Sequence, residues 1–454
     1  MGTVPDQLPY LVARWEPFPF DHRRRRRRGD RSRPHPAARG VSPTPLAAWL
    51  LGASAVSALL LPWPVALVLA LVVMGAAAAD AFSARRDVRV SSDIPGLLAR
   101  GVPAAFSIEL DPPQTTARVR QPAPPDLVVS PAESPNGLGG TVTALRRGRH
   151  LLPVPAVRID GPLRLGRHFR RAGEEHEVLV YPDLPEAWRL ARAVRTGRLS
   201  VEGRRPRGPL GLGTDFESIR DYQWDDDIRQ VNWSATVRMG RPMSNQYRVE
   251  QDRDVICVVD AGRLMGAPLG GAKRLDIALD AVAALCFVAD ELSDHCGAVA
   301  FDSSLLREIS PRRRGARTVV RALFDLEPSR ADSDYELAFR AASQAKRSFV
   351  VVLTDLLEEA AARPLIEAVP LLAPRHAVLV ASPIDTDIEA LVTGPVESVE
   401  DAYAAAAAVD VLAARTRAVA RLRASGADVV QAPPRLFAAA CVESYLRAKQ
   451  RARL

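Results

Sequence analysis

The strongest constraint on the fold is a stretch near the N-terminus that has no charged side chain. Leu46 to Ala79 covers 34 positions, and all of them are uncharged. Soluble cores rarely use such a segment, whereas a helix needs about 20 apolar residues to cross a bilayer core. Pro62-Trp63-Pro64 divides the stretch into two arms of similar length. We therefore expect a transmembrane helical hairpin over residues 43–82, with its turn at these prolines.

Arginines on both sides of this stretch indicate its orientation. Arg23–Arg28 precede it, and Arg85, Arg86 and Arg89 follow it. Because basic flanks favour the cytoplasmic side, both ends of the hairpin are expected in the cytoplasm. A single kinked helix would separate the two flanks, and a hairpin that enters without fully crossing remains an alternative. The predicted location is the cell membrane, multi-pass, with membrane lipid as a partner and the soluble domains in the cytoplasm.

The positive charge of the chain is concentrated in its first segment. The formal net charge is +8, and residues 1–40 hold ten arginines against four acidic residues. The basicity therefore belongs to a tail rather than to a folded nucleic-acid surface, and no nucleic-acid partner is expected. We predict a disordered, Arg-rich arm over residues 1–42 near anionic headgroups. An anionic-lipid or nucleic-acid binder that works through this arm is kept as an alternative function.

The hydrophobic pattern of the remaining sequence predicts two folded domains and a connector between them. Residues 87–185 alternate in short segments separated by proline and glycine, which predicts a small β-sandwich. Residues 186–253 form a connector that begins with a short helix. In residues 254–454, short apolar runs alternate with amphipathic helical stretches, which is typical of a doubly wound parallel α/β sheet. The fold class is therefore α/β, preceded by the hairpin and the sandwich.

A motif in the connector carries a family resemblance. Its characteristic residues are Phe216, Arg220, Tyr222, Asp226, Asp227, Arg229, Asn232 and Trp233. This pattern resembles the signature of the bacterial family called domain of unknown function 58, and the resemblance covers nearly the whole chain after residue 45. Physically, adjacent carboxylates beside arginines indicate a loop held by charge-assisted hydrogen bonds. Trp233 is interpreted as a core anchor.

The resemblance also implies that residues 254–454 are similar to a von Willebrand factor A domain. Such domains hold a divalent cation through an Asp-x-Ser-x-Ser motif, a threonine and a second aspartate. Asp260 and Asp355 match the two aspartates, whereas Gly262 and Leu264 lack the hydroxyls and Ser333 stands for the threonine. Because magnesium prefers six oxygen ligands, we expect no cofactor, and a cation held by Asp260 and Asp355 is the weaker reading. The predicted binding rim of this degenerate site consists of Asp260, Gly262, Arg263, Ser333 and Asp355.

The functional expectation comes from the resemblance. No nucleophile or zinc-protease motif occurs in the sequence, so no catalytic residue and no small-molecule substrate are assigned. The resemblance implies a non-enzymatic, membrane-anchored adaptor that partners a MoxR-type AAA+ ATPase in protein maturation or complex assembly. Arg263 would then pair with a carboxylate of the partner. The alternative is a metal-dependent hydrolase or transferase that uses the aspartates at 225–227 with Asp260 and Asp355.

Overall fold

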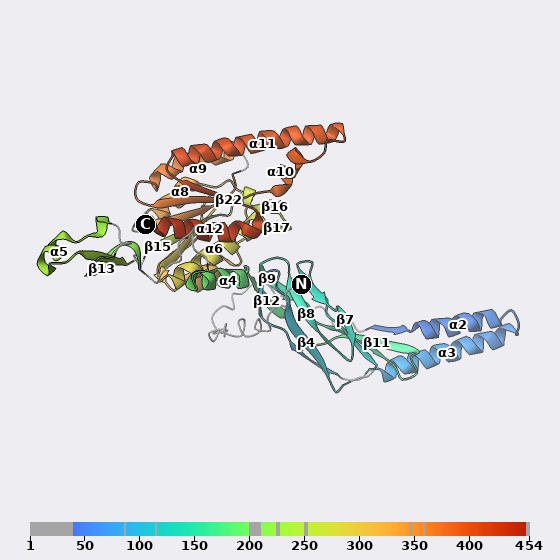
Figure 1. Ribbon diagram of the computed structural model, residues 1–454. Helices are drawn as coiled ribbons and strands as arrows, with labels where there is room; N and C mark the ends of the chain where they lie inside the picture. Colours follow the sequence, from blue (N-terminus) through green and yellow to red (C-terminus); the bar gives the residue numbers. More distant parts are fainter. Residues whose placement is uncertain are drawn as a thin grey trace.

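The computed structural model describes residues 40–85, 88–113, 116–198, 210–223, 228–248, 253–344, 347–356 and 359–450. The fold is mixed α/β with several separate sheets. Figure 1 shows a helical pair, a β region and an α/β region, which follow one another along the chain. Of the Arg-rich arm predicted over residues 1–42, residues 1–39 lie outside the described residues. For residues 40–42 the prediction of disorder is wrong, because they belong to a strand that pairs with residues 166–169.

Two antiparallel apolar helices lie side by side at one end of the molecule (Figure 1): α2 (Pro45–Ser57) and α3 (Trp63–Ser83). The expected turn at Pro62-Trp63-Pro64 is wrong, because Trp63 and Pro64 already belong to the first turn of α3. Proline is tolerated there, since the first amides of a helix have no partner within it. The arms are also unequal, with 13 and 21 residues. Within the described residues, only α3 is long and apolar enough to cross a membrane, by length and composition.

The helical pair is fixed to the β region through a buried carboxylate. Asp80, near the end of α3, is 3% exposed. Its two oxygens accept hydrogen bonds from the backbone amides of Leu163, Leu165 and Gly166 at 2.8–2.9 Å. A Cβ atom on Gly166 would lie 2.2 Å from the carbonyl oxygen of Ala77, so glycine is required for this close approach. The base of the hairpin is therefore held tightly against the turn at residues 161–166.

The β region (residues 88–181) contains the short strands expected from its alternating sequence. They are β2 (Arg89–Asp93), β3 (Leu97–Ala99), β4 (Ala104–Asp111), β5 (Ala117–Arg120), β6 (Leu127–Ser130), β7 (Glu133–Pro135), β8 (Gly137–Ala144), β9 (Gly148–Leu152), β10 (Ala156–Asp160), β11 (Gly166–Arg171) and β12 (His176–Tyr181), and β1 (Gly40–Pro43) joins from before the hairpin. The sheets have the orders β1-β11-β10-β5-β7, β2-β4-β8-β6 and β3-β12-β9. All three contribute side chains to one apolar core. Helix α4 (Leu184–Arg195) follows.

The α/β region (residues 253–450) is built on a six-stranded sheet. Its strands are β15 (Asp254–Asp260), β18 (His295–Phe301), β19 (Leu305–Arg313), β20 (Ser348–Leu353), β21 (Ala377–Pro383) and β22 (Asp428–Ala432), in the order β19-β18-β15-β20-β21-β22. The predicted parallel pairing is confirmed for five strands, whereas the edge strand β19 runs antiparallel to β18. A small hairpin, β16 (Pro268–Leu269) with β17 (Ala272–Lys273), precedes the first helix.

Helices cover both faces of this sheet. The helices of this region are α6 (Arg274–Glu291), α7 (Ala316–Leu323), α8 (Tyr335–Ala342), α9 (Glu359–Ala368), α10 (Thr386–Thr393), α11 (Val399–Ala424) and α12 (Pro434–Gln450), and among them α10 has no residue buried against the sheet. Alternate residues of β15 point to opposite faces, since the period of a strand is two. Val255, Cys257 and Val259 join α6, α7 and α12 in one core. Ile256 and Val258 join α8, α9 and α11 in the other.

Buried ion pairs and stacked rings join the β region to the α/β region. The Arg147 guanidinium lies 2.6 Å from the carboxylate of Asp276 on α6, and both side chains are almost fully buried. The ring of Tyr181 stacks on that of Phe324, with 4.7 Å between the centroids. Helix α4 also packs against α6. These contacts make the two regions one continuous body.

Candidate functional site: the carboxyl edge of the sheet

The residues predicted for the rim come from neighbouring strand ends. Asp260 ends β15, and Asp355 follows the end of β20. The two strands are parallel neighbours, so their carboxyl ends meet at the same edge of the sheet. Ligands of open α/β sheets usually bind at this edge.

The carboxylate of Asp260 is saturated by four hydrogen bonds from the protein itself. Its Oδ1 accepts from the Gly262 amide at 2.8 Å and from the Ser333 hydroxyl at 2.5 Å. Its Oδ2 accepts from the Tyr335 phenol at 3.0 Å and from the Thr354 hydroxyl at 2.6 Å. Burial and the neighbouring Asp260 charge raise the pKa of Tyr335, which keeps the phenol protonated as a donor. Asp260 is therefore a structural centre of this loop cluster.

Residue 262 is a glycine because the neighbouring Ser333 leaves no room for a side chain at this position. A Cβ atom at this position would lie 2.1 Å from the Ser333 Oγ atom. A serine here, as in the cation-binding motif of the resembled domains, would displace Ser333 from Asp260. Residue 262 therefore has no side-chain hydroxyl to offer a cation, and the space is used by Ser333, which donates to Asp260.

Asp355 is paired with an arginine from the first turn of α6. The Arg274 Nη1 atom donates to Asp355 Oδ1 at 2.7 Å, and both side chains are about 3% exposed. Arg415 of α11 is also buried nearby. Burial lowers the pKa of Arg415, and the charge of Asp355 opposes this shift. The carboxylate that the resemblance assigns to a metal is thus paired with Arg274, and it also interacts electrostatically with Arg415.

These residues do not fit a divalent cation. A magnesium ion needs free oxygen ligands, and its charge would be repelled by Arg274 and Arg415. The Asp260 oxygens already accept from four donors, and Asp355 is held by a guanidinium. In the described part of the chain, no group of three or more histidine, cysteine, aspartate or glutamate side chains could hold a metal ion.

The structure brings together most, but not all, of the predicted rim. Asp260, Gly262 and Ser333 are in direct contact, and Thr354, the residue before Asp355, donates a hydrogen bond to Asp260. Arg263 points away: its Nε atom lies 2.5 Å from Asp332 at the exposed surface. Sequence reasoning missed Tyr335, Thr354, Arg274 and Arg415. Thr354 and Tyr335 lie beside predicted site residues in the sequence, whereas no local signal marks the two arginines.

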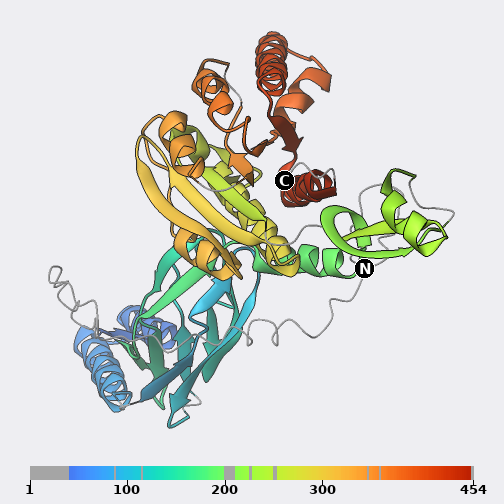
Figure 2. The ribbon, with the colours of Figure 1, turned by 90° about the vertical axis from the view of Figure 1, so that its left-hand side faces the viewer.

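The family signature lies on a separate projecting element, seen at the left of Figure 1 and in green in Figure 2. We call it the signature arm: β13 (Leu210–Asp221), the short helix α5 (Trp233–Met239) and β14 (Met243–Arg248), with η1 (Ile228–Gln230) before α5. The Asn232 side chain caps α5 by accepting from the Ala235 amide at 2.9 Å. Its amide nitrogen also donates to Asn245 at 2.8 Å.

The interpretation of Trp233 as a core anchor is wrong. Trp233 is 67% exposed, and none of the described residues covers it in a second layer over α5. Among the described residues of the same arm, four further apolar residues are exposed: Ile219, Ile228, Val237 and Met239.

The remaining signature residues are described only in part. Arg220 donates from Nη1 to the carbonyl oxygen of Asp221 at 3.1 Å, and Tyr222 follows β13. Phe216 and Arg229 lie in β13 and η1, and their side chains fall outside the described residues. Asp226 and Asp227 belong to residues 224–227, which also lie outside the described residues. The charge-assisted hydrogen bonds predicted for this loop, and its use by a hydrolase, therefore stay predictions.

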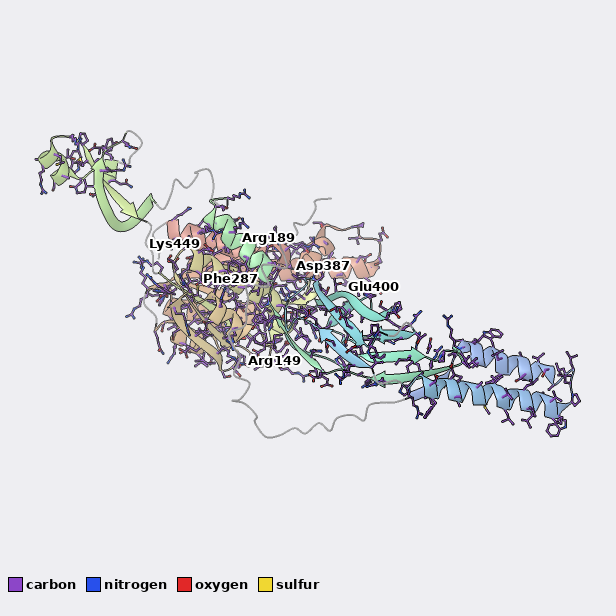
Figure 3. All side chains as sticks on the ribbon, turned by 90° about the horizontal axis from the view of Figure 1, so that it is seen from below. Arg149, Arg189, Phe287, Asp387, Glu400 and Lys449 are labelled. Carbon is purple, nitrogen blue, oxygen red and sulfur yellow. The ribbon has the colours of Figure 1, made fainter. Side chains whose placement is uncertain are left out.

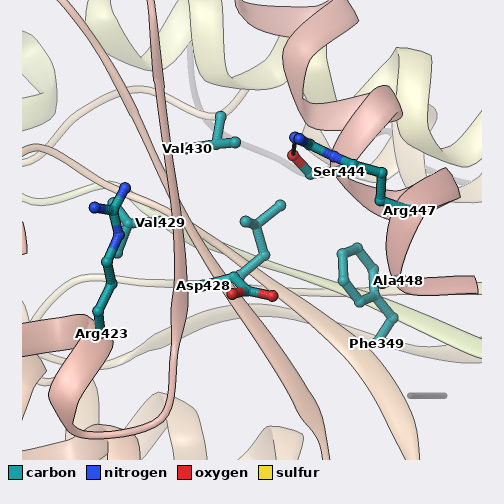
Figure 4. A pocket seen from close by; sticks show the side chains of 9 residues that line it. Phe349, Arg423, Asp428, Val429, Val430, Ser444, Arg447 and Ala448 are labelled. Carbon is teal, nitrogen blue, oxygen red and sulfur yellow. Dashed lines mark hydrogen bonds between the residues drawn. The ribbon is translucent and has the colours of Figure 1, made fainter. Parts of the chain in front are cut away.

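A shallow depression lies at the opposite end of the strands, beside the edge strand β22 (Figure 4). It is lined by Phe349, Leu379, Arg423, Asp428, Val429, Val430, Ser444, Arg447 and Ala448. Arg447 donates to the Ser444 hydroxyl at 3.0 Å across its wall. None of the predicted site residues contributes to it.

Comparisons with known proteins agree with the resemblance read from the signature. Residues 218–427 match the model of the family described as "Protein of unknown function DUF58". The match begins two residues after Phe216 and is thus narrower than the expected extent, since the hairpin and the β region lie outside it. The chain is also similar to "Uncharacterized protein Rv1480" of Mycobacterium tuberculosis and "Uncharacterized protein Mb1516" of Mycobacterium bovis. Each is 26% identical over 218 residues, which are 44% of this chain and 67% of the relative.

Proposed function

We propose, from the membership of residues 218–427 in the DUF58 family, that this protein is a membrane-anchored adaptor whose soluble body faces the cytoplasm. In this proposal the protein is not an enzyme, and it holds a partner protein at the membrane. The partner implied by the resemblance is a MoxR-type AAA+ ATPase that acts in protein maturation or complex assembly.

The anchor in this proposal is the pair α2 and α3. Leu59, Leu60 and Trp63 at its tip are exposed, as are many apolar side chains along both helices. Such a surface is stable in lipid and unfavourable in water. Both ends of the pair lie at the β region, because β1 before α2 pairs with β11 and Asp80 holds the end of α3. The chain then enters the bilayer and returns to the same side, and the arginines flanking the pair favour the cytoplasmic side.

The α/β region is proposed to resemble a von Willebrand factor A domain that has lost its metal. The six-stranded sheet with helices on both faces supports this likeness, as do Asp260 and Asp355 at neighbouring strand ends. The hydrogen bonds of Asp260 and the Arg274–Asp355 pair support a structural role for both carboxylates. They therefore disfavour the alternative of a metal-dependent hydrolase or transferase.

The observation that carries the adaptor proposal is the exposed apolar surface of the signature arm. Trp233 and Val237 are four residues apart on α5 and therefore lie on one face. Both are largely exposed, with Ile228 and Met239 on the same arm. Exposed apolar clusters of this kind mark protein interaction sites, and tryptophan is enriched among the residues that dominate binding energy. The arm thus offers the ATPase an anchor point away from the membrane.

A pull-down of the detergent-solubilised full chain tests this proposal. The wild type is expected to recover a MoxR-type ATPase, identified by mass spectrometry. The pair Trp233→Ala with Val237→Ser should reduce this recovery at least tenfold. Leu436→Ser, an exposed apolar residue on α12, is the matched control and should leave recovery unchanged. Recovery of no AAA+ ATPase by the wild type would contradict the partnership.

A further inference from the structure

One end of the α/β region carries a strongly acidic projection. Residues 377–414 contain seven acidic residues and no lysine or arginine. α10 and the first half of α11 extend beyond the rest of the α/β region (Figure 1), and Asp387 and Glu400 are labelled there in Figure 3. We call residues 385–410 the acidic arm. Its carboxylates belong to Asp385, Asp387, Glu389, Glu397, Glu400, Asp401 and Asp410.

The acidic arm also exposes apolar side chains. Val399 and Tyr403 are 73% and 75% exposed, and they lie four residues apart on α11. Leu391 and Val396, just before this helix, are exposed as well. A helix face that combines exposed apolar residues with carboxylates is suited to a basic protein surface.

The opposite edge of the same sheet is basic. Residues 305–321, which we call the basic edge, contain six arginines and a single acidic residue, Glu308. The six arginines are all exposed: Arg307, Arg312, Arg313, Arg314, Arg317 and Arg321. They lie on and after β19, which pairs with β18 alone among the described strands. This edge of the sheet is therefore open to a partner.

The order of the strands separates the two charged surfaces within one molecule. β19 and β22 are the two ends of the six-stranded sheet. Five strand spacings of about 4.8 Å separate them by roughly 24 Å, and α10 and α11 connect β21 to β22 at the far end. Opposite charge at opposite ends is the arrangement that a head-to-tail contact between identical chains requires.

We propose that copies of this chain associate head to tail, with the acidic arm of one copy docked on the basic edge of the next. The contact is heterologous, because each copy uses two different surfaces. It therefore builds a ring or an open row rather than a closed two-fold dimer. The arginines of the basic edge pair with the carboxylates of the acidic arm, and Val399 and Tyr403 cover the open edge of β19.

The expected association is salt-dependent and stronger at a membrane. Exposed ion pairs are individually weak, so their charges determine the choice of partner more than the affinity. Anchoring would confine the copies to one plane and raise their effective concentration. This last step rests on the proposed anchoring, whereas the charge pairing does not.

Charge reversal of each surface provides the test. One variant, Arg312→Glu with Arg314→Glu, makes the basic edge acidic. The other, Glu397→Arg with Glu400→Arg, makes the acidic arm basic. Full chains labelled with donor or acceptor dyes are reconstituted in lipid vesicles, and energy transfer between copies measures association. Reversal at Arg171 and Arg192, two exposed arginines elsewhere, is the matched control.

We expect energy transfer in the wild type and in the control, and a loss of at least tenfold in each reversed variant alone. Mixing the two reversed variants should restore the signal, because each then supplies the charge that the other needs. This rescue also excludes misfolding as the cause of the loss. Absence of transfer in the wild type, or a mixture that fails to recover, would overturn the proposal. Energy transfer between copies does not depend on the ATPase. A failure of this proposal can therefore be distinguished from a failure of the adaptor proposal.

Discussion

Asp260 and Asp355 are satisfied by different groups, although they come from neighbouring strand ends. Asp260 accepts hydrogen bonds from neutral donors, including Tyr335 and Thr354. Asp355 is paired with the Arg274 guanidinium. A buried carboxylate needs such compensation, since desolvation of an unpaired charge is expensive. The carboxyl edge of the sheet is therefore stabilised by the protein's own donors and cations.

Removing the guanidinium should strongly destabilise the α/β region. Arg274→Ala leaves Asp355 buried with only Arg415 nearby, and the loss of one partner of a buried pair typically costs about 3–5 kcal/mol. Chemical denaturation of the full chain in detergent measures the change. The double variant Arg274→Ala with Asp355→Ala should recover part of the loss. A cost below about 1 kcal/mol for the single variant, the level of an exposed pair, would contradict this account.

Stability should also be independent of divalent cations. Because Asp355 is paired with Arg274 and the charge of Arg415 also acts on it, neither excess magnesium nor EDTA is expected to move the unfolding midpoint of the wild type. Differential scanning fluorimetry measures this directly. A midpoint that rises with millimolar magnesium and falls with EDTA would mean that a cation occupies this edge after all.

At this scale the sequence predicts part of the site. The resemblance to the von Willebrand factor A pattern points to Asp260, Ser333 and Asp355, and in the structure Asp260 contacts Ser333 and the residue before Asp355. It fails for Arg274 and Arg415, since their contacts depend on how α6 and α11 pack over the sheet. The sequence also fails to predict the exposure of Trp233. A large aromatic residue in a motif is expected to be buried, and the sequence does not show that α5 projects from the body.

At the scale of elements, the joint between α3 and the β region depends on one side chain. Asp80 lies at the end of an apolar helix, yet it binds three amides of the turn at residues 161–166. Bonds of this kind, with one charged partner, contribute about 1.5–3 kcal/mol each. The carboxylate thus couples the orientation of the hairpin to the β region.

Replacing this carboxylate should loosen the joint. Asp80→Asn substitutes an amide donor for one acceptor oxygen and leaves at least one of the three amides without a partner. We expect at least tenfold faster hydrogen exchange at Leu163, Leu165 and Gly166, with exchange in β15 unchanged. Asp93→Asn, at an exposed position on β2, serves as the control. Equal protection from hydrogen exchange in the wild type and in Asp80→Asn would show that Asp80 does not hold the end of α3 against the β region.

The elements themselves are predictable where they are apolar. Strands β15, β18, β20, β21 and β22 are visible as short hydrophobic runs, and α6 is visible by its periodicity. The sequence does not mark β19 as an apolar run, because this antiparallel edge strand contains three arginines and a proline. The helix α10 is not marked by a buried apolar face, since none of its residues is buried. Met243 and Ser244, which are neighbours at the start of β14, are both buried, so burial there does not follow the alternation that marks a strand.

At the scale of the molecule, the contact between the β region and α6 contains a titratable group. Asp280 of α6 is paired with Arg100 and accepts a hydrogen bond from the Asp183 amide at 2.9 Å. Burial raises the pKa of Asp280 to about 6, against the attraction of Arg100. The pKa of Asp280 is therefore higher in the folded state than in the unfolded chain. Asp280 contributes its full stabilising free energy below about pH 4, and this contribution is lost as the pH rises through 6.

This shift predicts a pH dependence of the contact. Acidification from pH 7 to pH 5 should stabilise the wild type relative to Asp280→Asn by about 1 kcal/mol, because only the wild type takes up the proton. Denaturation curves of both proteins at the two pH values measure the difference. An identical pH response of the two proteins would show that Asp280 does not titrate in this range.

The arrangement of the regions is the part of the structure least accessible from sequence. Boundaries follow from composition, but the docking of the β region on α6 depends on Arg147 and Asp276, which are distant in sequence and carry no motif. The hairpin is the reverse case: its apolar sequence predicts it directly, and its unequal arms follow from where the helix after Pro62 begins.

The most direct test of the account is the side of the membrane on which the α/β region lies. Arg330, exposed after α7, can be replaced by cysteine, because the four native cysteines are buried. A membrane-impermeant maleimide is applied to intact and to permeabilised cells. If the body lies in the cytoplasm, Arg330→Cys is labelled only after permeabilisation, whereas equal labelling in intact cells would place the body outside the cytoplasm and contradict the proposed orientation.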